Sequence, residues 1–348
     1  MSEALLEIKD LKINFKSYEG TAKVINGVSL KVNKGEVISL VGESGCGKSV
    51  TVRSILGLVP TPPAQFVNGD ITFEGQSLLG LNEKDWQKIR GKGISMVFQD
   101  PMTALNPVFT IGQQLIDVYM WQGKKNTLFT SMKDKRELRK KGRARAIEIL
   151  EKMRIPDPEG ILERYPVELS GGMRQRIVIA LALMHTPKLL IADEPGTALD
   201  VSVQDQILIE LKRLVEMEGI SMIFITHNLG VARMISDRVY VMYAGEVVEE
   251  ATTQNLFKQS YHPYTNGLLS SIPKLNGQMG DGIDGKIPDF LNPPQGCRFY
   301  DRCSERIDHC KQTPPTLQTL SDGRRVSCHL FDEEVQSNGK LYIAGGRS

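Results

Sequence analysis

The sequence predicts an α/β protein with a parallel sheet covered by helices, and three observations point to this class. A short apolar run at 36–41 leads into a glycine-rich loop, as expected for a buried parallel strand. Strand and helix signals alternate over 186–245, as they do in βα units. The pattern over 101–185 is helical, so this stretch looks like an insertion into the sheet.

The individual elements follow from apolar periodicity and from turn residues. Strands are expected at 4–15, 23–33, 36–41, 69–75, 93–98, 188–193, 221–226 and 237–243. Helices are expected at 48–58, 82–90, 171–184 and 202–217. After residue 251 proline and glycine become frequent and strand signals fade. We therefore expect one domain over 1–250, with a helical subdomain at about 101–185, and a C-terminal extension over 251–348.

Charge and hydropathy exclude several classes of protein. The 348 residues include 43 Lys and Arg against 41 Asp and Glu, so the net charge is +2. A charge this close to neutral does not indicate nucleic-acid binding. The longest apolar run is at 177–184, far short of the roughly 18 residues that span a bilayer. The first ten residues are acidic and polar, unlike a signal peptide. These features predict a cytosolic protein, in which structural disulfides are rare.

One segment has a strong local charge. Residues 124–145 carry ten Lys and Arg side chains against Asp134 and Glu137. A solvated helix face is the simpler interpretation. Contact with anionic lipid headgroups near a membrane is the alternative, and the sequence leaves both open.

A phosphate-binding loop is predicted at 42–49. These residues read GESGCGKS and match G-x-x-x-x-G-K-[ST] between an expected strand and an expected helix. The three glycines let backbone N–H groups point at phosphate oxygens, and the following helix adds its positive dipole end. Lys48 can reach the β- and γ-phosphates, Ser49 can ligate Mg²⁺, and Cys46 is interpreted as a small packing residue. The predicted nucleotide contacts are Gly42, Glu43, Ser44, Gly45, Cys46, Gly47, Lys48, Ser49 and Val50.

Polar residues at the ends of three expected strands suggest the rest of a hydrolytic site. In LLIADE (189–194), Asp193 is predicted to hold Mg²⁺ and Glu194 to act as general base for the attacking water. Gln99 could place its amide oxygen near Mg²⁺ and the water, and His227 falls where a γ-phosphate sensor is needed. A lone histidine at a strand end is more often structural, so His227 depends on its setting.

A second helix N-terminus suited to phosphate lies in LSGGMRQR (169–176), where Ser170, Gly171 and Gly172 open an expected helix. A chain with one phosphate loop needs no second site for its own nucleotide. The segment makes sense if it meets ATP that another subunit holds.

With this segment the chain closely resembles the ATP-binding cassette family over about residues 4–250. Six motifs follow in order: Walker A at 42–49, the Q-loop at Gln99, the signature at 169–173, Walker B at 189–194, the D-loop at 198–200 and the switch at His227. The resemblance implies a RecA-like parallel core, an antiparallel β subdomain and a helical signature subdomain. It also implies two cassettes that close head to tail on two ATP molecules, with Asp200 at that site. In such proteins an aromatic residue of the early hairpin stacks on adenine, which favours Tyr18 and then Phe15.

The C-terminal part adds a second resemblance. Residues 261–265 read YHPYT, and four cysteines follow as C-x5-C-x6-C-x17-C: Cys297, Cys303, Cys310 and Cys328. Together these resemble the extension of ATPase subunits from bacterial oligopeptide and dipeptide importers, whose four cysteines hold a [4Fe–4S] cluster. The YHPYT segment could equally be plain helix packing.

The residues alone also favour a metal. Four cysteines concentrated within 32 residues of a cytosolic protein favour ligands over disulfides. Four thiolates suit an iron–sulfur cluster or tetrahedral Zn²⁺, and buried free thiols are the third possibility. His309 and His329 each lie beside a cysteine and are possible substitute ligands.

One position departs from the family. Importers of this type usually have Thr after the Walker B Glu-Pro, and this chain has Gly196. A glycine there could loosen the D-loop backbone. Hydrolysis is still expected, because Asp193, Glu194 and Asp200 are all present.

The resemblance implies an ATP-hydrolysing subunit that powers peptide uptake from the cytoplasmic face of a membrane. Its implied partners are a second cassette, often non-identical, two transmembrane permease subunits and, indirectly, an extracytoplasmic peptide-binding protein. Three alternatives stay open: the same machine importing nickel or another small solute, a soluble cassette ATPase acting on nucleic acid or ribosomes, and a non-hydrolysing regulatory module. The last predicts a damaged catalytic motif, and none is seen.

Overall fold

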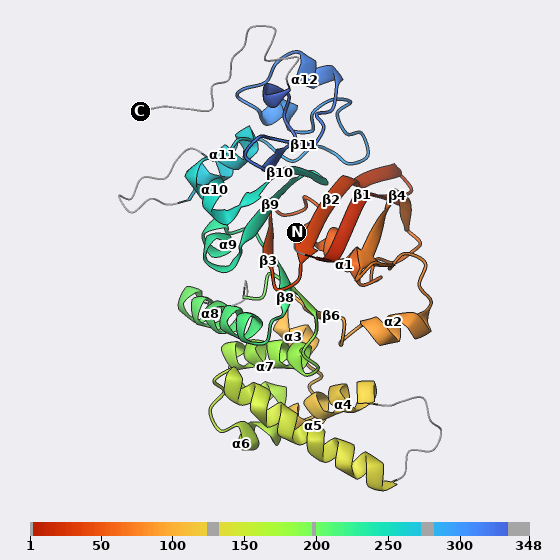
Figure 1. The fold of residues 1–348 in the computed structure, drawn as a ribbon, viewed down its shortest axis with the longest axis vertical. Coiled ribbons are helices and arrows are strands. Elements are labelled where there is room, and N and C mark those ends of the chain that lie inside the picture. Colours follow the sequence, from red (N-terminus) through yellow and green to blue (C-terminus); the bar gives the residue numbers. More distant parts are fainter. Residues whose placement is uncertain (1–2, 124–131, 197–199, 273–281, 333–348) are drawn as a thin grey trace. The chain divides into compact units, whose positions relative to one another are not determined.

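The computed structural model describes residues 3–123, 132–196, 200–272 and 282–332 (Figure 1). The chain divides into two compact units. The first unit comprises residues 1–33, 37–80 and 224–348, and the second comprises 34–36 and 81–223. Strand β8 (Ser221–Thr226) begins in the second unit and ends in the first.

An antiparallel sheet of the first unit is built from the N-terminal hairpin. The strands β1 (Ala4–Ser17) and β2 (Gly20–Asn33) pair antiparallel, and β1 also pairs with β4 (Ala64–Phe73). The short β5 (Gln76–Ser77) completes the order β2-β1-β4-β5. All three long strands lie where the sequence predicts strands, although β4 begins at 64 rather than at 69.

A second sheet of the same unit contains both parallel and antiparallel pairs. The predicted strand β3 (Val37–Val41) is fully buried and runs parallel to β9 (Arg238–Tyr243). The next strands, β10 (Glu246–Thr252), β12 (Arg325–Val326) and β11 (Gln318–Thr319), continue this sheet antiparallel from β9. Its order is β11-β12-β10-β9-β3 within this unit. The C-terminal extension therefore contributes two strands to the sheet, which the fading strand signal after 251 does not predict.

The first unit also contains helices, of which α9 and α10 contact strands of this sheet. The helices are α1 (Lys48–Ile55), α9 (Leu229–Ile235), α10 (Thr253–Lys258), α11 (Pro263–Ser270) and α12 (His309–Gln312). Helix α1 ends before the expected residue 58, because Gly57 takes a left-handed φ of +62°. Side chains of Asn228, Thr252 and His262 accept N–H groups at the starts of α9, α10 and α11.

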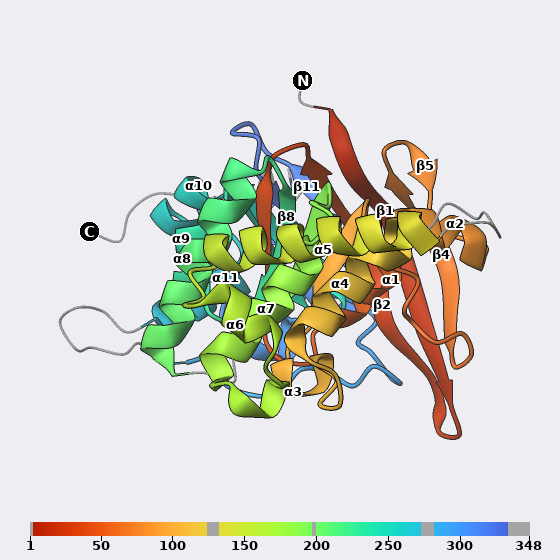
Figure 2. The same cartoon turned by 90° about the horizontal axis from the view of Figure 1, so that it is seen from below.

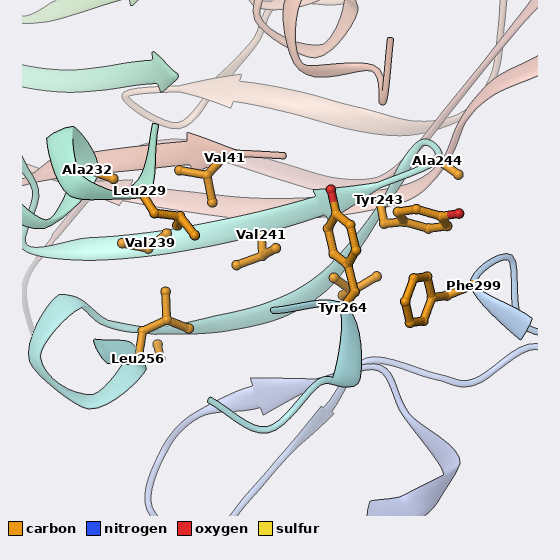
Figure 3. Close-up of a cluster of buried hydrophobic side chains, with 12 residues drawn as sticks. Val41, Leu229, Ala232, Val239, Val241, Tyr243, Ala244, Leu256, Tyr264 and Phe299 are labelled. Carbon is orange, nitrogen blue, oxygen red and sulfur yellow. The ribbon is translucent and has the colours of Figure 1, made fainter. Parts of the chain in front are cut away.

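A buried cluster joins the sheet and these helices (Figure 3). Val41 and Val241 from the parallel strand pair lie with Leu229 of α9 and Leu256 of α10. Tyr243, Tyr264 and Phe299 gather at one end of it, as Figure 3 shows. Their rings make edge or tilted contacts with centroids 4.7 to 5.4 Å apart. Because Phe299 comes from the C-terminal extension, that segment is part of the core of this unit.

The second unit contains a parallel strand pair and most of the helices. Strands β6 (Ile94–Val97) and β7 (Leu189–Asp193) pair parallel. The helices are α2 (Glu83–Ile89), α3 (Pro101–Ala104), α4 (Ile111–Gly123), α5 (Met132–Lys152), α6 (Pro158–Leu162), α7 (Gly171–Leu183) and α8 (Val201–Met217). The helices α3 to α7 fall within the stretch 101–185 that has a helical sequence pattern. Long α5 runs along α4 and α7 (Figure 2).

The basic segment lies partly on α5. Residues 124–131 are outside the described part, and Lys133, Arg136 and Lys140 on α5 are exposed. Arg145 points inward and donates to the carbonyls of Leu183 and Met184 at the end of α7, each at 3.3 Å. Contact with lipid headgroups stays an untested alternative to the solvated helix face. Among the described helices, none combines the length and the apolar character needed to span a membrane.

Candidate functional site

The phosphate-loop sequence forms a tight turn between β3 and α1 in the first unit. Gly42 has a φ of +153°, and a Cβ there would lie 2.2 Å from the carbonyl oxygen of Met242. Gly47 has a φ of +104°, and its Cβ would lie 2.8 Å from Ile25 Cδ1. Only glycine fits both positions, so the loop has the backbone that the motif demands.

The Lys48 side chain is folded back over this loop. Its Nζ donates to the carbonyls of Gly42 at 2.7 Å and Glu43 at 2.9 Å, and the residue is 5% exposed. Cys46 is fully buried inside the loop, and burial raises the pKa of its thiol. The Cys46 carbonyl accepts the N–H of Gly245 at 2.8 Å, so the structure agrees with a packing role for this cysteine.

Glu43, the second residue of the loop, contacts the C-terminal extension. The Arg302 guanidinium donates to both of its carboxylate oxygens, at 2.9 and 3.0 Å. The Glu43 backbone N–H donates to the Tyr264 hydroxyl at 3.0 Å. No motif in the sequence indicated Arg302, and Tyr264 was visible only as part of YHPYT.

Two further predicted residues of the first unit are at the surface. Tyr18 lies in the turn between β1 and β2 and is fully exposed. His227 follows β8 and is also exposed, just before Asn228 at the start of α9. Both side chains are accessible, as residues that contact a nucleotide must be.

In the second unit, two predicted catalytic side chains touch. The Gln99 amide donates to a carboxylate oxygen of Glu194 at 3.1 Å, although 95 residues separate them. Glu194 has a left-handed φ of +47°, which turns the chain away directly after β7. Asp193, the last residue of β7, is 3% exposed. Strained backbone of this kind at a non-glycine residue is common where function fixes the geometry.

The signature and D-loop residues share one open groove. Ser170 is the N-cap of α7, and its hydroxyl accepts the N–H of Met173 at 3.4 Å. Asp200 is the N-cap of α8 and accepts the N–H of Val203 at 3.0 Å, which lowers the pKa of its carboxyl. The groove is lined by Ser170, Gly171, Gly172, Met173, Arg176, Asp200, Val203 and Gln206. Two helix N-termini therefore open onto one groove.

The unusual Gly196 packs against α8. A Cβ at this position would lie 2.8 Å from Gln204 Cγ, so a threonine here would require the Gln204 side chain to move. The first two residues of the D-loop, 198 and 199, are outside the described residues.

The four C-terminal cysteines converge. Cys297, Cys303, Cys310 and Cys328 all line one small cavity, and all four are free thiols. Burial raises the pKa of Cys297 to about 12 and that of Cys303 to about 11. No group of three or more His, Cys, Asp or Glu side chains in the described ranges is arranged around one metal-ion position.

The two histidines named as alternative ligands lie side by side near the cysteines. Both ring nitrogens of His329 are hydrogen bonded, Nδ1 to Asp332 at 2.5 Å and Nε2 to the Thr313 carbonyl at 2.9 Å. The His309 ring stacks edge-on against it at 4.5 Å. Because its nitrogens are already engaged, His329 does not replace a cysteine in this arrangement.

Comparison with known proteins decides the family. Residues 25–197 match the family model described as "ABC transporter", and residues 248–310 match "Oligopeptide/dipeptide transporter, C-terminal region". A dipeptide transport ATP-binding protein of Bacillus subtilis (strain 168) is 45% identical over 96% of this chain and 97% of its own. This chain belongs to the ABC transporter family.

Other relatives agree with this ABC transporter assignment. An oligopeptide transport ATP-binding protein of Bacillus subtilis (strain 168) is 47% identical over 95% of this chain and 90% of its own. Among solved structures, a dimeric ATP-binding cassette bound to ADP and phosphate superimposes with a TM-score of 0.60 at 28% identity. It covers 72% of this chain and 99% of that chain. The predicted α/β cassette fold is therefore confirmed.

Proposed function

We propose that this ABC transporter subunit hydrolyses ATP to power the import of oligopeptides or dipeptides across a membrane. The observation that carries the proposal is the joint presence of both family matches, one over the ATPase part and one over 248–310. Relatives that match along almost the whole chain are named for dipeptide and oligopeptide transport.

The motif residues divide into nucleotide holders and reacting groups. Residues 42–50 would cradle the phosphates, Lys48 would neutralise the β- and γ-phosphates, and Tyr18 would stack on adenine. Ser49, Gln99 and Asp193 would hold Mg²⁺, which would neutralise charge that develops on the phosphoryl group. Glu194 would accept the proton of the attacking water, positioned by its contact with Gln99, and His227 would contact the γ-phosphate.

The signature groove suggests a second cassette. Ser170, Gly171, Gly172 and Asp200 line this groove. A chain with one phosphate loop needs no second phosphate site for its own nucleotide, so the groove would meet ATP held by a partner. We infer that the partner is a second, non-identical cassette. Both cassettes would dock on two transmembrane permease subunits. A peptide-binding protein outside the membrane would deliver substrate to the permease. The subunit itself would lie at the cytoplasmic face of the membrane as a peripheral protein.

The domain limits remain our assignment: the cassette over 1–250 and the importer-type extension over 251–348. We further propose that the extension holds a [4Fe–4S] cluster on Cys297, Cys303, Cys310 and Cys328. The donor set fits, because the four thiols come from separate short segments and line one cavity. Burial raises the pKa of the Cys297 and Cys303 thiols, and a bound metal would supply positive charge that stabilises their thiolates. A single tetrahedral Zn²⁺ needs all four sulfurs about 2.3 Å from one point, whereas a cluster spreads them over four irons.

The transport proposal is tested in liposomes that contain the complete complex with its permease subunits. We expect ATP hydrolysis to rise when the peptide-binding protein and a short peptide are added together, with peptide accumulating inside. A nickel salt in place of the peptide is the comparison. Stimulation by nickel and none by peptides of two to five residues would contradict the proposal.

Lys48→Ala should weaken ATP binding about 10- to 100-fold, because one charge-assisted phosphate contact is worth roughly 1.5–3 kcal/mol. The measurement is equilibrium titration with a fluorescent ATP analogue in the presence of Mg²⁺. Lys258→Ala is the control, since Lys258 is an exposed lysine at the end of α10 in the same unit. Equal affinity for Lys48→Ala and the wild type would remove the phosphate-loop assignment.

A further inference from the structure

The most specific contact that the motifs do not explain joins the phosphate loop to the C-terminal extension. Arg302 forms an ion pair with Glu43 through two hydrogen bonds, one to each carboxylate oxygen. The Arg302 side chain is 6% exposed. Paired geometry of this kind fixes direction as well as distance, which a lysine could not do.

Arg302 is itself held firmly. Its Nε donates to the Asp284 carbonyl at 2.8 Å and its Nη2 to the Ile283 carbonyl at 3.1 Å. The guanidinium also lies 5.6 Å from the centre of the Tyr243 ring. These partners leave the side chain few alternative rotamers, so Glu43 meets a preordered group.

A second contact acts on the backbone of the same loop residue. The hydroxyl of Tyr264, which is fully buried, accepts the Glu43 N–H at 3.0 Å. Its ring is held by Tyr243 and Phe299, with centroids 4.7 and 5.4 Å away. Figure 3 shows these three rings together. The extension thus restrains both the side chain and the main chain at the start of the loop.

We call the contacts of Arg302 and Tyr264 with Glu43 the clamp, and its Arg302 lies between two of the cysteines in the sequence. The 3-10 turn Tyr300–Arg302 is bracketed by Cys297, whose carbonyl accepts the Tyr300 N–H at 3.1 Å, and by Cys303, whose N–H donates to the Tyr300 carbonyl at 3.3 Å. Arg302 therefore projects from a short turn between two residues of the four-cysteine cavity.

We propose that Arg302 and Tyr264 are positioning residues that hold the phosphate loop in its nucleotide-binding shape from the C-terminal extension. A loop that must point several N–H groups at phosphate loses conformational entropy on binding unless it is ordered beforehand. The clamp supplies that order in the free protein. The inference rests on the proposed function, since it assumes that the loop binds ATP.

The test compares ATP affinity and turnover of full-length variants purified anaerobically. We expect Arg302→Gln to raise the Kd for Mg-ATP about five- to twentyfold, with kcat at saturating ATP within about twofold of wild type. Arg302→Lys should recover little, because it keeps the charge and loses the two-point geometry. Arg325→Gln is the matched control: it removes another arginine of the extension, and its partner Glu250 keeps Arg238.

A double-mutant cycle separates a clamp from a general loss of structure. If the pair acts as a unit, Arg302→Gln added to Glu43→Gln should weaken ATP binding no further. Additive effects, or wild-type affinity for Arg302→Gln, would overturn the clamp. Tyr264→Phe removes only the hydroxyl and carries the test if Arg302→Gln does not fold, with a Kd increase expected and an unchanged Kd counting against it. A wild-type chain that fails to bind ATP would overturn the proposed function as well.

Discussion

Glu194→Gln should lower steady-state ATP hydrolysis by about 10²- to 10⁴-fold while ATP binding is retained. The carboxylate follows β7 on a left-handed residue and accepts a hydrogen bond from Gln99. An amide of the same shape can keep that contact, because its oxygen also accepts, but it cannot take a proton from water. The loss is therefore expected in kcat and not in affinity for ATP.

The measurement is phosphate release from Mg-ATP alongside an equilibrium ATP titration. Glu216→Gln serves as control, since Glu216 on α8 is 60% exposed and lies 3.9 Å from Lys212. Hydrolysis by Glu194→Gln at the wild-type rate would show that another group is the base. Loss of ATP binding would show instead that Glu194 holds the nucleotide.

Anaerobically purified protein should contain about four irons and four sulfides per chain, with a broad absorption band near ~410 nm. Cys328→Ser should lose most of this iron, because its thiol lines the same cavity as the other three. A chain without the metal should also unfold at lower temperature, since the cysteines tie together turns that have few apolar residues. Iron, sulfide and zinc analysis with thermal unfolding checks these outcomes.

The fifth cysteine provides the matched control. Cys46 is buried in the phosphate loop and does not line the four-cysteine cavity, so Cys46→Ser should keep the full iron content. About one zinc per chain without iron would show that the four cysteines bind zinc, and would contradict the cluster. A chain with no metal would leave the cassette assignment in place and contradict the cluster.

Much of the site could be predicted because its signals are local. The Walker A pattern, the apolar run before Asp193 and the cap at Ser170 each depend on a few neighbouring residues, and the structure places each at the end of the expected element. The shared position of the four cysteines could also be anticipated, since four cysteines within 32 residues suggest a common ligand site.

What the sequence could not indicate depends on distant partners. Arg302 and Glu43 are 259 positions apart, and neither belongs to a pattern that predicts the other. Strand β10 was also missed, because its sequence EVVEEAT reads as polar. Its Glu249 is nevertheless fully buried and accepts the N–H groups of Tyr261 and His262 at 2.8 and 2.9 Å. Tertiary partners thus override the local preference for solvent.

The pairing of β10 with β12 means that the extension is no removable appendage. A chain cut after α10 would lack the partner that pairs with Glu249 and Glu250, and the exposed backbone of β10 would become an open edge. The Glu249 carboxylate would at the same time lose the two N–H groups that satisfy it. Such a truncated ATPase would be prone to self-association through that edge. Experiments on shortened chains would therefore measure aggregation rather than the role of the extension.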